Sequence, residues 1–369
     1  MDKKDKIAII LTGAALGFAG VFLMLNGNPA NMGFCIACFL RDIAGALKLH
    51  SASAVQYARP EIIGLILGAF TISLATREFR ARGGSSPLTR FFLGFMVMIG
   101  ALIFLGCPLR MVLRMAAGDL NAWIGLVGFV LGTYIGALFL RKGFSLGRTH
   151  KLNAFEGAIL PALQIPLFVM LAIASPLLAF SESGPGSMHA SIWLALGLSF
   201  AIGILAQRSR ICQSGGIRDL FIIRDPHLLW GNVAIFGVAL LYNLLTNNIQ
   251  VGFYHQPIAH SQWIWNIAGM VVVGLGSVLL GGCPMRQLVL TGMGNVDSAI
   301  TVLGFLAGAA FSHNFNLASA ADIYQEGTNL VTGGGTTANG RIAILTALLV
   351  MLAIGFVYTK RQIKPTVKQ

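Results

Sequence analysis

The sequence contains ten apolar runs, each long enough to cross a lipid bilayer as a helix. A spanning helix needs roughly 20 predominantly apolar residues, and it must satisfy its own backbone polar groups because lipid offers them no partner. Of the 369 residues, 56% are hydrophobic and 11% are charged, whereas a soluble domain carries about 25% charged residues. We therefore expect an all-α polytopic membrane protein. The predicted spans are 7–26, 60–76, 89–106, 121–140, 157–180, 190–206, 229–246, 263–282, 297–313 and 341–359.

Four further apolar stretches are too short to cross. We expect them to form short re-entrant helices, which enter the membrane and return to the same side. These stretches are 36–49, 108–117, 213–223 and 284–293.

The basic residues fit this count of spans. Lys and Arg accumulate on cytoplasmic loops, and the loops predicted outside, 181–189, 247–262 and 314–340, contain neither. We therefore expect a protein of the plasma (inner) membrane with both termini in the cytoplasm. The basic residues assigned to the inner side are Lys3, Lys4, Lys6, Arg77, Arg80, Arg82, Arg90, Arg141, Lys142, Arg148, Lys151, Arg208, Arg210, Lys360, Arg361, Lys364 and Lys368.

One predicted outer stretch breaks the rule, since Arg41, Lys48 and Arg59 lie between the first two spans. If this stretch folds back into the protein, its charges are not ordinary loop charges. The formal net charge of +13 is explained mainly by the cytoplasmic loops, with attraction of anionic substrates as the second explanation. Nucleic acid is not an expected partner.

The two halves of the sequence repeat one another. Cys35 precedes Arg41-Asp42 by six residues, as Cys212 precedes Arg218-Asp219, at an offset of 177. The segment Gly106-Cys107-Pro108-Leu109-Arg110 matches Gly282-Cys283-Pro284-Met285-Arg286 at an offset of 176. Landmarks that share one offset indicate an internal duplication.

The repeat divides the chain into four parts. Residues 1–150 form a first repeat with four spans, 151–186 a connecting span, 187–320 a second repeat with four spans, and 321–369 an extra span with a basic tail. A single connecting span turns the second half upside down, which predicts two inverted pseudo-symmetric halves, an arrangement typical of transporters. Because 157–180 contains Pro161, Pro166 and Pro176, a kinked or broken span stays open.

The repeated Cys-Pro pairs predict helix starts. Proline is favoured at the first helical position, so Pro108 and Pro284 place Cys107 and Cys283 next to unpaired backbone N–H groups, which attract anions. We expect Cys35 and Cys107 to line an outer approach, and Cys212 and Cys283 an inner one. A thiol is a weak donor and a polarizable acceptor, which suits a large, soft anion.

Several of these residues have a second interpretation. A single cysteine in a membrane span is usually an apolar filler, but four cysteines at repeat-related positions favour function. Arg110 and Arg286 either recruit an anion or extend to the membrane interface. The pairs at Arg41 and Arg218 are expected to anchor the short helices.

Cys38 has no counterpart, since Gly215 occupies its place in the second half. It either packs in the core or forms a redox or metal CxxC pair with Cys35. The seven histidines show no ligand spacing, so we predict no cofactor and no metal site.

These cysteines and the paired Gly-Cys-Pro-x-Arg segments resemble the YeeE/YedE family of membrane proteins. The resemblance covers the chain apart from the last span and tail. It implies sulfur uptake, an hourglass shape with inverted halves, and a central path lined by Cys35, Cys107, Cys212 and Cys283. The segment from Gly33 to Asp42 is more similar to a YedE-related branch associated with selenium metabolism. Cys38 and the span 341–359 are departures from the nine-span pattern of the thiosulfate importers.

The leading hypothesis is a transporter, not an enzyme, for a small sulfur- or selenium-containing anion such as thiosulfate. Its expected partners are this anion, the lipid bilayer and a small cytoplasmic carrier protein for sulfur or selenium. No GxxxxGK[ST] segment supplies nucleotide binding. The alternatives are a thiol-disulfide redox protein that uses Cys35 and Cys38, and a soft-metal cation channel. The net positive charge disfavours the channel.

Overall fold

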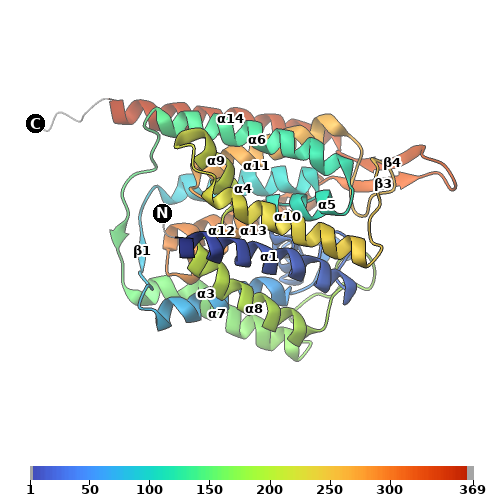
Figure 1. The fold of residues 1–369 in the computed structure, drawn as a ribbon, viewed down its shortest axis with the longest axis horizontal. Coiled ribbons are helices and arrows are strands. Elements are labelled where there is room, and N and C mark those ends of the chain that lie inside the picture. The colour runs from blue at the N-terminus through green and yellow to red at the C-terminus, as the bar shows by residue number, and fades with distance from the viewer. Residues whose placement is uncertain (1–2, 364–369) are drawn as a thin grey trace, which may run out of the picture.

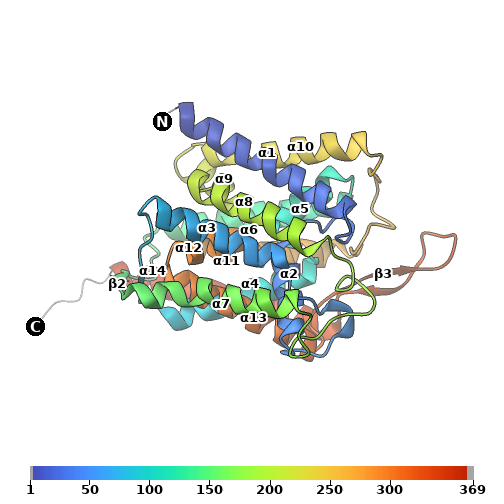
Figure 2. The same cartoon turned by 90° about the horizontal axis from the view of Figure 1, so that it is seen from below.

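Ten long helices form the body of the protein in the computed structural model, which describes residues 3–363 and the side chains from 5 to 360. Each of them corresponds to one of ten helical segments that are long and apolar enough to cross a membrane, so the predicted polytopic all-α fold is confirmed (Figures 1 and 2). Lys364 and Lys368 of the tail lie outside the described residues. The long helices are α1 (Lys3–Leu25), α3 (Pro60–Ala75), α4 (Pro87–Phe104), α6 (Leu120–Arg141), α7 (Ala154–Ala172), α8 (Ile192–Ser209), α10 (His227–Leu245), α11 (Trp263–Leu279), α13 (Val296–Asn314) and α14 (Ala338–Ile363).

The four stretches too short to cross form short helices, as predicted. They are α2 (Ile36–Ala46), α5 (Pro108–Ala116), α9 (Gln213–Ile222) and α12 (Pro284–Gly292). A single 3-10 turn, Ser53–Val55, follows α2. We call the end of the molecule where α1 begins the inner end, and the opposite end the outer end. In Figure 2, α9 and α12 lie toward the inner end, and α2 and α5 toward the outer end.

Two small antiparallel sheets were not predicted. At the inner end, β1 (Arg82–Gly83) pairs with β2 (His150–Lys151). At the outer end, β3 (Ala320–Tyr324) and β4 (Val331–Gly335) form a hairpin in which Ala320 faces Gly335 and Tyr324 faces Val331. The hairpin projects away from the helices (Figure 1). Its second strand is rich in glycine and lacks the alternation of apolar and polar side chains that predicts a strand.

The long helices pack in pairs, each with one member from either half of the sequence. The pairs are α1 with α10, α3 with α8, α4 with α13, and α6 with α11. If α1, α3, α4 and α6 are matched in order with α8, α10, α11 and α13, each pair maps onto another pair. This exchange is what a two-fold axis relating the halves requires.

The direction of the helices agrees with an inverted repeat. Within a pair, Gly13 lies against Gly231 and Gly17 against Ile235, so α1 and α10 run parallel. The repeat mates α4 and α11 also touch, with Gly100 against Gly269 and Val97 against Gly276. The residue number rises on one helix as it falls on the other, so these mates run in opposite directions.

The connecting helix α7 is continuous, although it contains Pro161 and Pro166. It starts with a capping box formed by Asn153 and Glu156. The predicted end at 180 is wrong, because α7 ends at Ala172. Ala174 adopts a left-handed backbone with φ 48°, which stops the helix, and Pro176 then lies beyond it.

Glycines allow the closest helix contacts. A Cβ atom added at Gly132 would lie 2.1 Å from the carbonyl oxygen of Val271, too close unless α6 and α11 separate. Gly197, on α8, has nothing within 4 Å of such an atom. We expect Gly132→Ala to lower the free energy of unfolding by ~1–3 kcal/mol through overpacking, and Gly197→Ala to cause no loss. Thermal unfolding in detergent checks this, and equal midpoints for both variants would contradict it.

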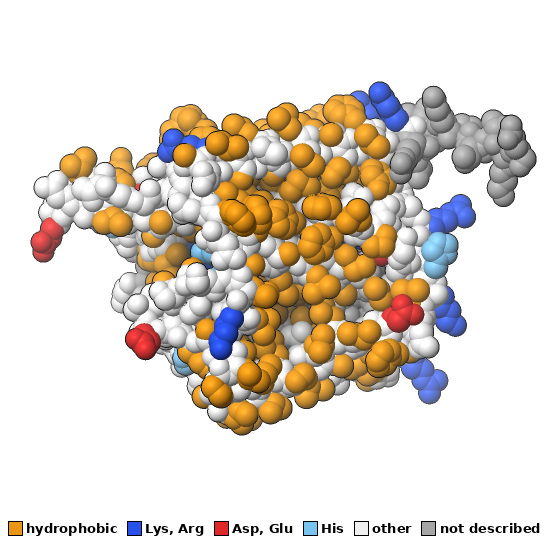
Figure 3. All heavy atoms as spheres, turned by 180° about the vertical axis from the view of Figure 1, so that it is seen from behind, with side chains coloured by type: hydrophobic (Ala, Val, Ile, Leu, Met, Phe, Trp, Pro, Cys, Tyr) orange, Lys and Arg blue, Asp and Glu red, His pale blue; other side chains and the backbone are white. Residues whose placement is uncertain are grey.

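The surface agrees with a membrane location. Hydrophobic side chains cover the middle of the face in Figure 3, and Lys and Arg gather at the edge beside the C-terminal end. The outer exceptions to this pattern have a physical reason. Arg41 and Arg59 are buried and share the carboxylate of Asp42, while the exposed Lys48 donates to the carbonyl of Pro176.

Candidate functional site

Each of the four repeat-related cysteines is the N-cap residue of a short helix. Cys35 caps α2, Cys107 caps α5, Cys212 caps α9 and Cys283 caps α12. Pro108 and Pro284 hold the first helical position after their cysteines, where proline needs no hydrogen bond. Every one of these thiols therefore lies beside the free backbone N–H groups of a helix start.

The outer thiols form a pair. The Sγ atoms of Cys35 and Cys107 are 3.9 Å apart, although 71 residues separate them in the chain. The Sγ of Cys35 also accepts a hydrogen bond from the backbone N–H of Cys38 at 3.4 Å. Two helix starts, from α2 and α5, thus meet at one point.

The inner thiols also lie together, at the starts of α9 and α12. The backbone N–H of Cys283 donates to the Sγ of Cys212 at 3.4 Å, and Cys212 also accepts from the backbone N–H of Gly215. The thiol of Cys283 donates to the Oε1 of Gln213 at 2.8 Å. Gln213 is a polar neighbour that sequence reasoning missed, because its counterpart in the first half is the apolar Ile36.

The two thiol pairs are closed to solvent. None of the five cysteines is more than 5% exposed, and all five are free thiols. The short helices also pack across the halves, α2 with α12 and α5 with α9. Passage of an ion between the pairs therefore requires the short helices to move apart.

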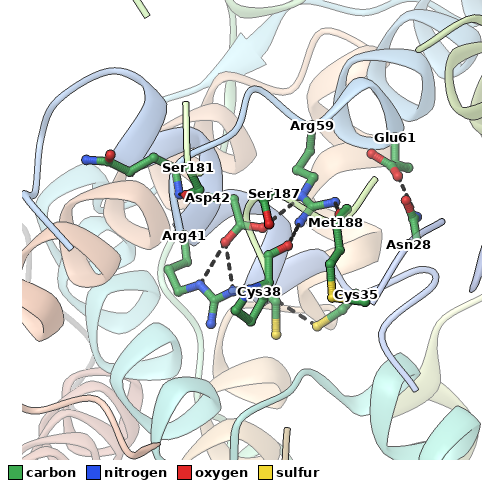
Figure 4. A network of polar contacts seen from close by, with 12 residues as sticks. Asn28, Cys35, Cys38, Arg41, Asp42, Arg59, Glu61, Ser181, Ser187 and Met188 are labelled. Carbon is green, nitrogen blue, oxygen red and sulfur yellow. Dashed lines mark hydrogen bonds and ion pairs between the residues drawn. The ribbon is translucent and has the colours of Figure 1, made fainter. Parts of the chain in front are cut away.

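Cys38 lies in the first turn of α2, next to Cys35. Its Sγ is 4.0 Å from the carbonyl oxygen of Leu105 and 3.8 Å from the Nη1 of Arg110. Figure 4 shows that Cys38 and Cys35 lie side by side at the start of α2.

The repeat-related arginines differ in their surroundings. Arg110 is fully buried, and its guanidinium donates to the backbone carbonyls of Asn31, Leu105 and Ile258. Arg286 is only partly buried, and its Nη1 atom is enclosed without a hydrogen-bond partner. Arg110 therefore stabilises the outer loops, whereas the Nη1 group of Arg286 keeps its N–H donors available.

A buried ionic network anchors α2. Asp42 accepts from Arg41 at 2.7 Å and from Arg59 at 2.8 Å, and Arg59 also donates to the carbonyls of Pro185 and Met188 (Figure 4). This network ties α2 to the loop after α7. In the second half, Arg218 pairs with Asp219, but that pair is partly exposed, and no third charged residue among those the structure describes joins it.

A second buried group beside this network is Glu61, in the first turn of α3. One of its carboxylate oxygens accepts from Asn28 at 2.6 Å, and the other has no hydrogen-bond partner within the described part of the chain. Neither residue was singled out in the sequence, since a lone Glu and a lone Asn carry no motif.

The described residues contain no cluster of three or more His, Cys, Asp or Glu that could hold a metal ion. The helix starts and thiols instead present weak donors.

Comparison with known proteins relates the chain to sulfur transporters. A family profile described as "Sulphur transport" matches residues 208–369. The "Thiosulfate transporter TsuA" of Spirochaeta thermophila is 29% identical over 191 residues, which cover 47% of this chain and 57% of that protein. The "Probable transporter YedE" of Salmonella typhimurium is 23% identical over 313 residues, 74% of this chain and 71% of that protein. The chain is therefore similar to proteins of the YeeE/YedE family.

The matched lengths qualify this relation. The "Thiosulfate transporter TsuA" of Escherichia coli is 25% identical over 172 residues, 45% of this chain and 47% of that protein. The chain thus aligns with about half the length of these two thiosulfate transporters. The family profile extends to the end of the chain and so includes α14, which the sequence analysis had set outside the resemblance.

Proposed function

We propose that this protein is a member of the YeeE/YedE family and transports a small, soft, sulfur-containing anion across the membrane along its two thiol pairs. The observation that carries the proposal is the placement of four repeat-related cysteines on the N-caps of four short helices. Each helix start offers partial positive charge, and each thiol offers a weak, polarizable contact.

Weak contacts suit transport better than a strong trap. An ion must bind well enough to enter and weakly enough to leave, and a thiol at a helix start meets both needs. In the proposed path, the anion passes first between Cys35 and Cys107 and then between Cys212 and Cys283. Since both pairs are closed, each opens in turn as its short helices separate.

Thiosulfate is the proposed substrate, because two relatives carry the name thiosulfate transporter. A selenium-containing anion is the second candidate, favoured by the similarity of the segment from Gly33 to Asp42 to the YedE-related branch. The proposed orientation places both termini and the basic inner end in the cytoplasm, as the positive-inside rule requires. A small cytoplasmic carrier of sulfur or selenium is a proposed partner.

The direct test is uptake by the purified protein in proteoliposomes. Radiolabelled thiosulfate is supplied outside, with radiolabelled selenite in a parallel arm and empty liposomes as the control. We expect thiosulfate to accumulate faster than in empty liposomes. Equal rates in both would overturn the proposal, and accumulation of selenite alone would replace the sulfur anion with a selenium anion.

Cys38 separates transport from thiol-disulfide chemistry. A redox function through Cys35 and Cys38 needs both thiols. Cys38 has no repeat mate, and its thiol contacts the Leu105 carbonyl and Arg110. We therefore expect Cys38→Ala to retain at least about half of wild-type uptake, because a buried free Cys packs as a small hydrophobe and the change leaves the four N-cap thiols in place. Loss of uptake in this variant, together with a Cys35–Cys38 disulfide detected by differential alkylation, would favour the redox function.

A further inference from the structure

A cavity of about 460 Å³ opens at the inner end of the molecule beside the inner thiol pair. We call it the inner cavity. Four arginines and one glutamate supply its charged groups, which gives it a net positive charge. Its lining consists of Glu78, Arg80, Arg82, Arg210, Arg286, Leu290, Met293 and Asn295.

The single acidic residue in the inner cavity is already engaged. Glu78 accepts from Gln207 at 2.7 Å and from Arg208 at 2.9 Å. The hydrogen bond from Gln207 and the charge of Arg208 lower the pKa of the Glu78 carboxyl, so it stays ionised and paired at neutral pH. Glu78 therefore offsets only one of the four positive charges that line the cavity.

These arginines have no other partners in the part of the chain that the structure describes. The guanidinium groups of Arg80, Arg82 and Arg210 make no hydrogen bond or ion pair with residues 3–363. A neighbouring cavity is different, because Asp5, Asp219 and Glu78 balance Arg208 and Arg210 there. Of these two cavities, only the inner cavity therefore has an excess of positive charge.

Arg286 connects the inner cavity to the transport path. It lies three residues after Cys283, and it lines the inner cavity together with Arg82 and Arg210. Its Nη1 atom is buried and donates to nothing, which costs free energy unless a ligand supplies the acceptor. The repeat mate Arg110 meets three backbone carbonyls instead.

We propose that the inner cavity is a binding site for a small divalent anion, held by Arg82, Arg210 and Arg286. Guanidinium groups bind oxyanions through two parallel hydrogen bonds, and three of them around one space suit a double negative charge. The identity of the anion rests on the proposed function: the site would receive the sulfur-containing anion as it leaves the Cys212–Cys283 pair. A phosphate headgroup of an anionic lipid offers the same chemistry, and the experiment must separate the two.

The test is calorimetric titration of the purified, full-length protein with thiosulfate, inorganic phosphate or sulfate. The variant Arg82→Gln/Arg210→Gln removes two exposed charges from the cavity. Arg77→Gln/Arg148→Gln is the matched control, since both arginines are exposed and line neither cavity. We expect the first variant to weaken binding by about tenfold or more, the effect of losing a charge-assisted hydrogen bond, and the control to bind as the wild type does.

Two results would overturn the site. One is equal affinity in the cavity variant and the control variant. The other is a lipid-dependent loss of thiosulfate binding: binding disappears in phosphatidylglycerol nanodiscs but persists in phosphatidylcholine nanodiscs. The headgroup of the anionic lipid would then be the ligand that occupies the cavity. Uptake by the wild type distinguishes the two proposals: uptake without cavity binding refutes the site alone, and cavity binding without uptake refutes transport alone.

Discussion

Replacement of Cys283 by serine is expected to reduce thiosulfate uptake by about tenfold or more while leaving the protein folded. A serine hydroxyl can still donate to the Oε1 of Gln213, as the thiol does, and it can cap α12. It loses the soft, polarizable contact of sulfur, and a lost contact of about 1.4 kcal/mol corresponds to a factor of ten. Uptake into proteoliposomes measures the effect.

Replacement of Cys107, the repeat mate of Cys283, tests whether both halves use their thiols in the same way. Cys107 occupies the corresponding N-cap and lies 3.9 Å from Cys35, so Cys107→Ser and Cys107→Ala should match the losses at Cys283. Cys38→Ala is the control for a buried cysteine outside the path. Wild-type uptake in the Cys107 and Cys283 variants, with unfolding midpoints unchanged, would remove the thiols from the mechanism.

Much of the fold could be predicted because it follows from local chemistry. Apolar run length and loop charge gave the ten spans, and a proline after a cysteine gave the starts of α5 and α12. The end of α7 was placed too late because Ile173 and Ala174 continue the apolar run, although the left-handed backbone at Ala174 ends the helix.

The site was less predictable where distant segments decide the chemistry. Arg110 and Arg286 have the same local sequence, and only the outer loops that supply the carbonyls of Asn31 and Ile258 make them different. Likewise, Arg41-Asp42 was read as an isolated pair, because nothing in the sequence indicates that Arg59 adds the third charge. Hydropathy and spacing describe one segment at a time and do not contain these contacts.

Because Arg59 adds a third charge to this network, replacement of Asp42 has the largest expected effect on stability. Asp42 is fully buried and is the counter-ion for both Arg41 and Arg59. The nearly isosteric change Asp42→Asn leaves two buried guanidinium groups without a counter-charge, which should cost about 3–5 kcal/mol.

Asp219→Asn is the matched control for this change, since the Arg218–Asp219 pair occupies the same place in the second half but is 20–26% exposed. Water can solvate Arg218 after the change, so we expect a loss of at most about 1 kcal/mol. Unfolding midpoints in detergent compare the two variants, and similar midpoints would show that the Asp42 network does not anchor α2. Because α2 carries Cys35 at its start, the Asp42 variant should also lose uptake in proportion to the fraction of protein that unfolds.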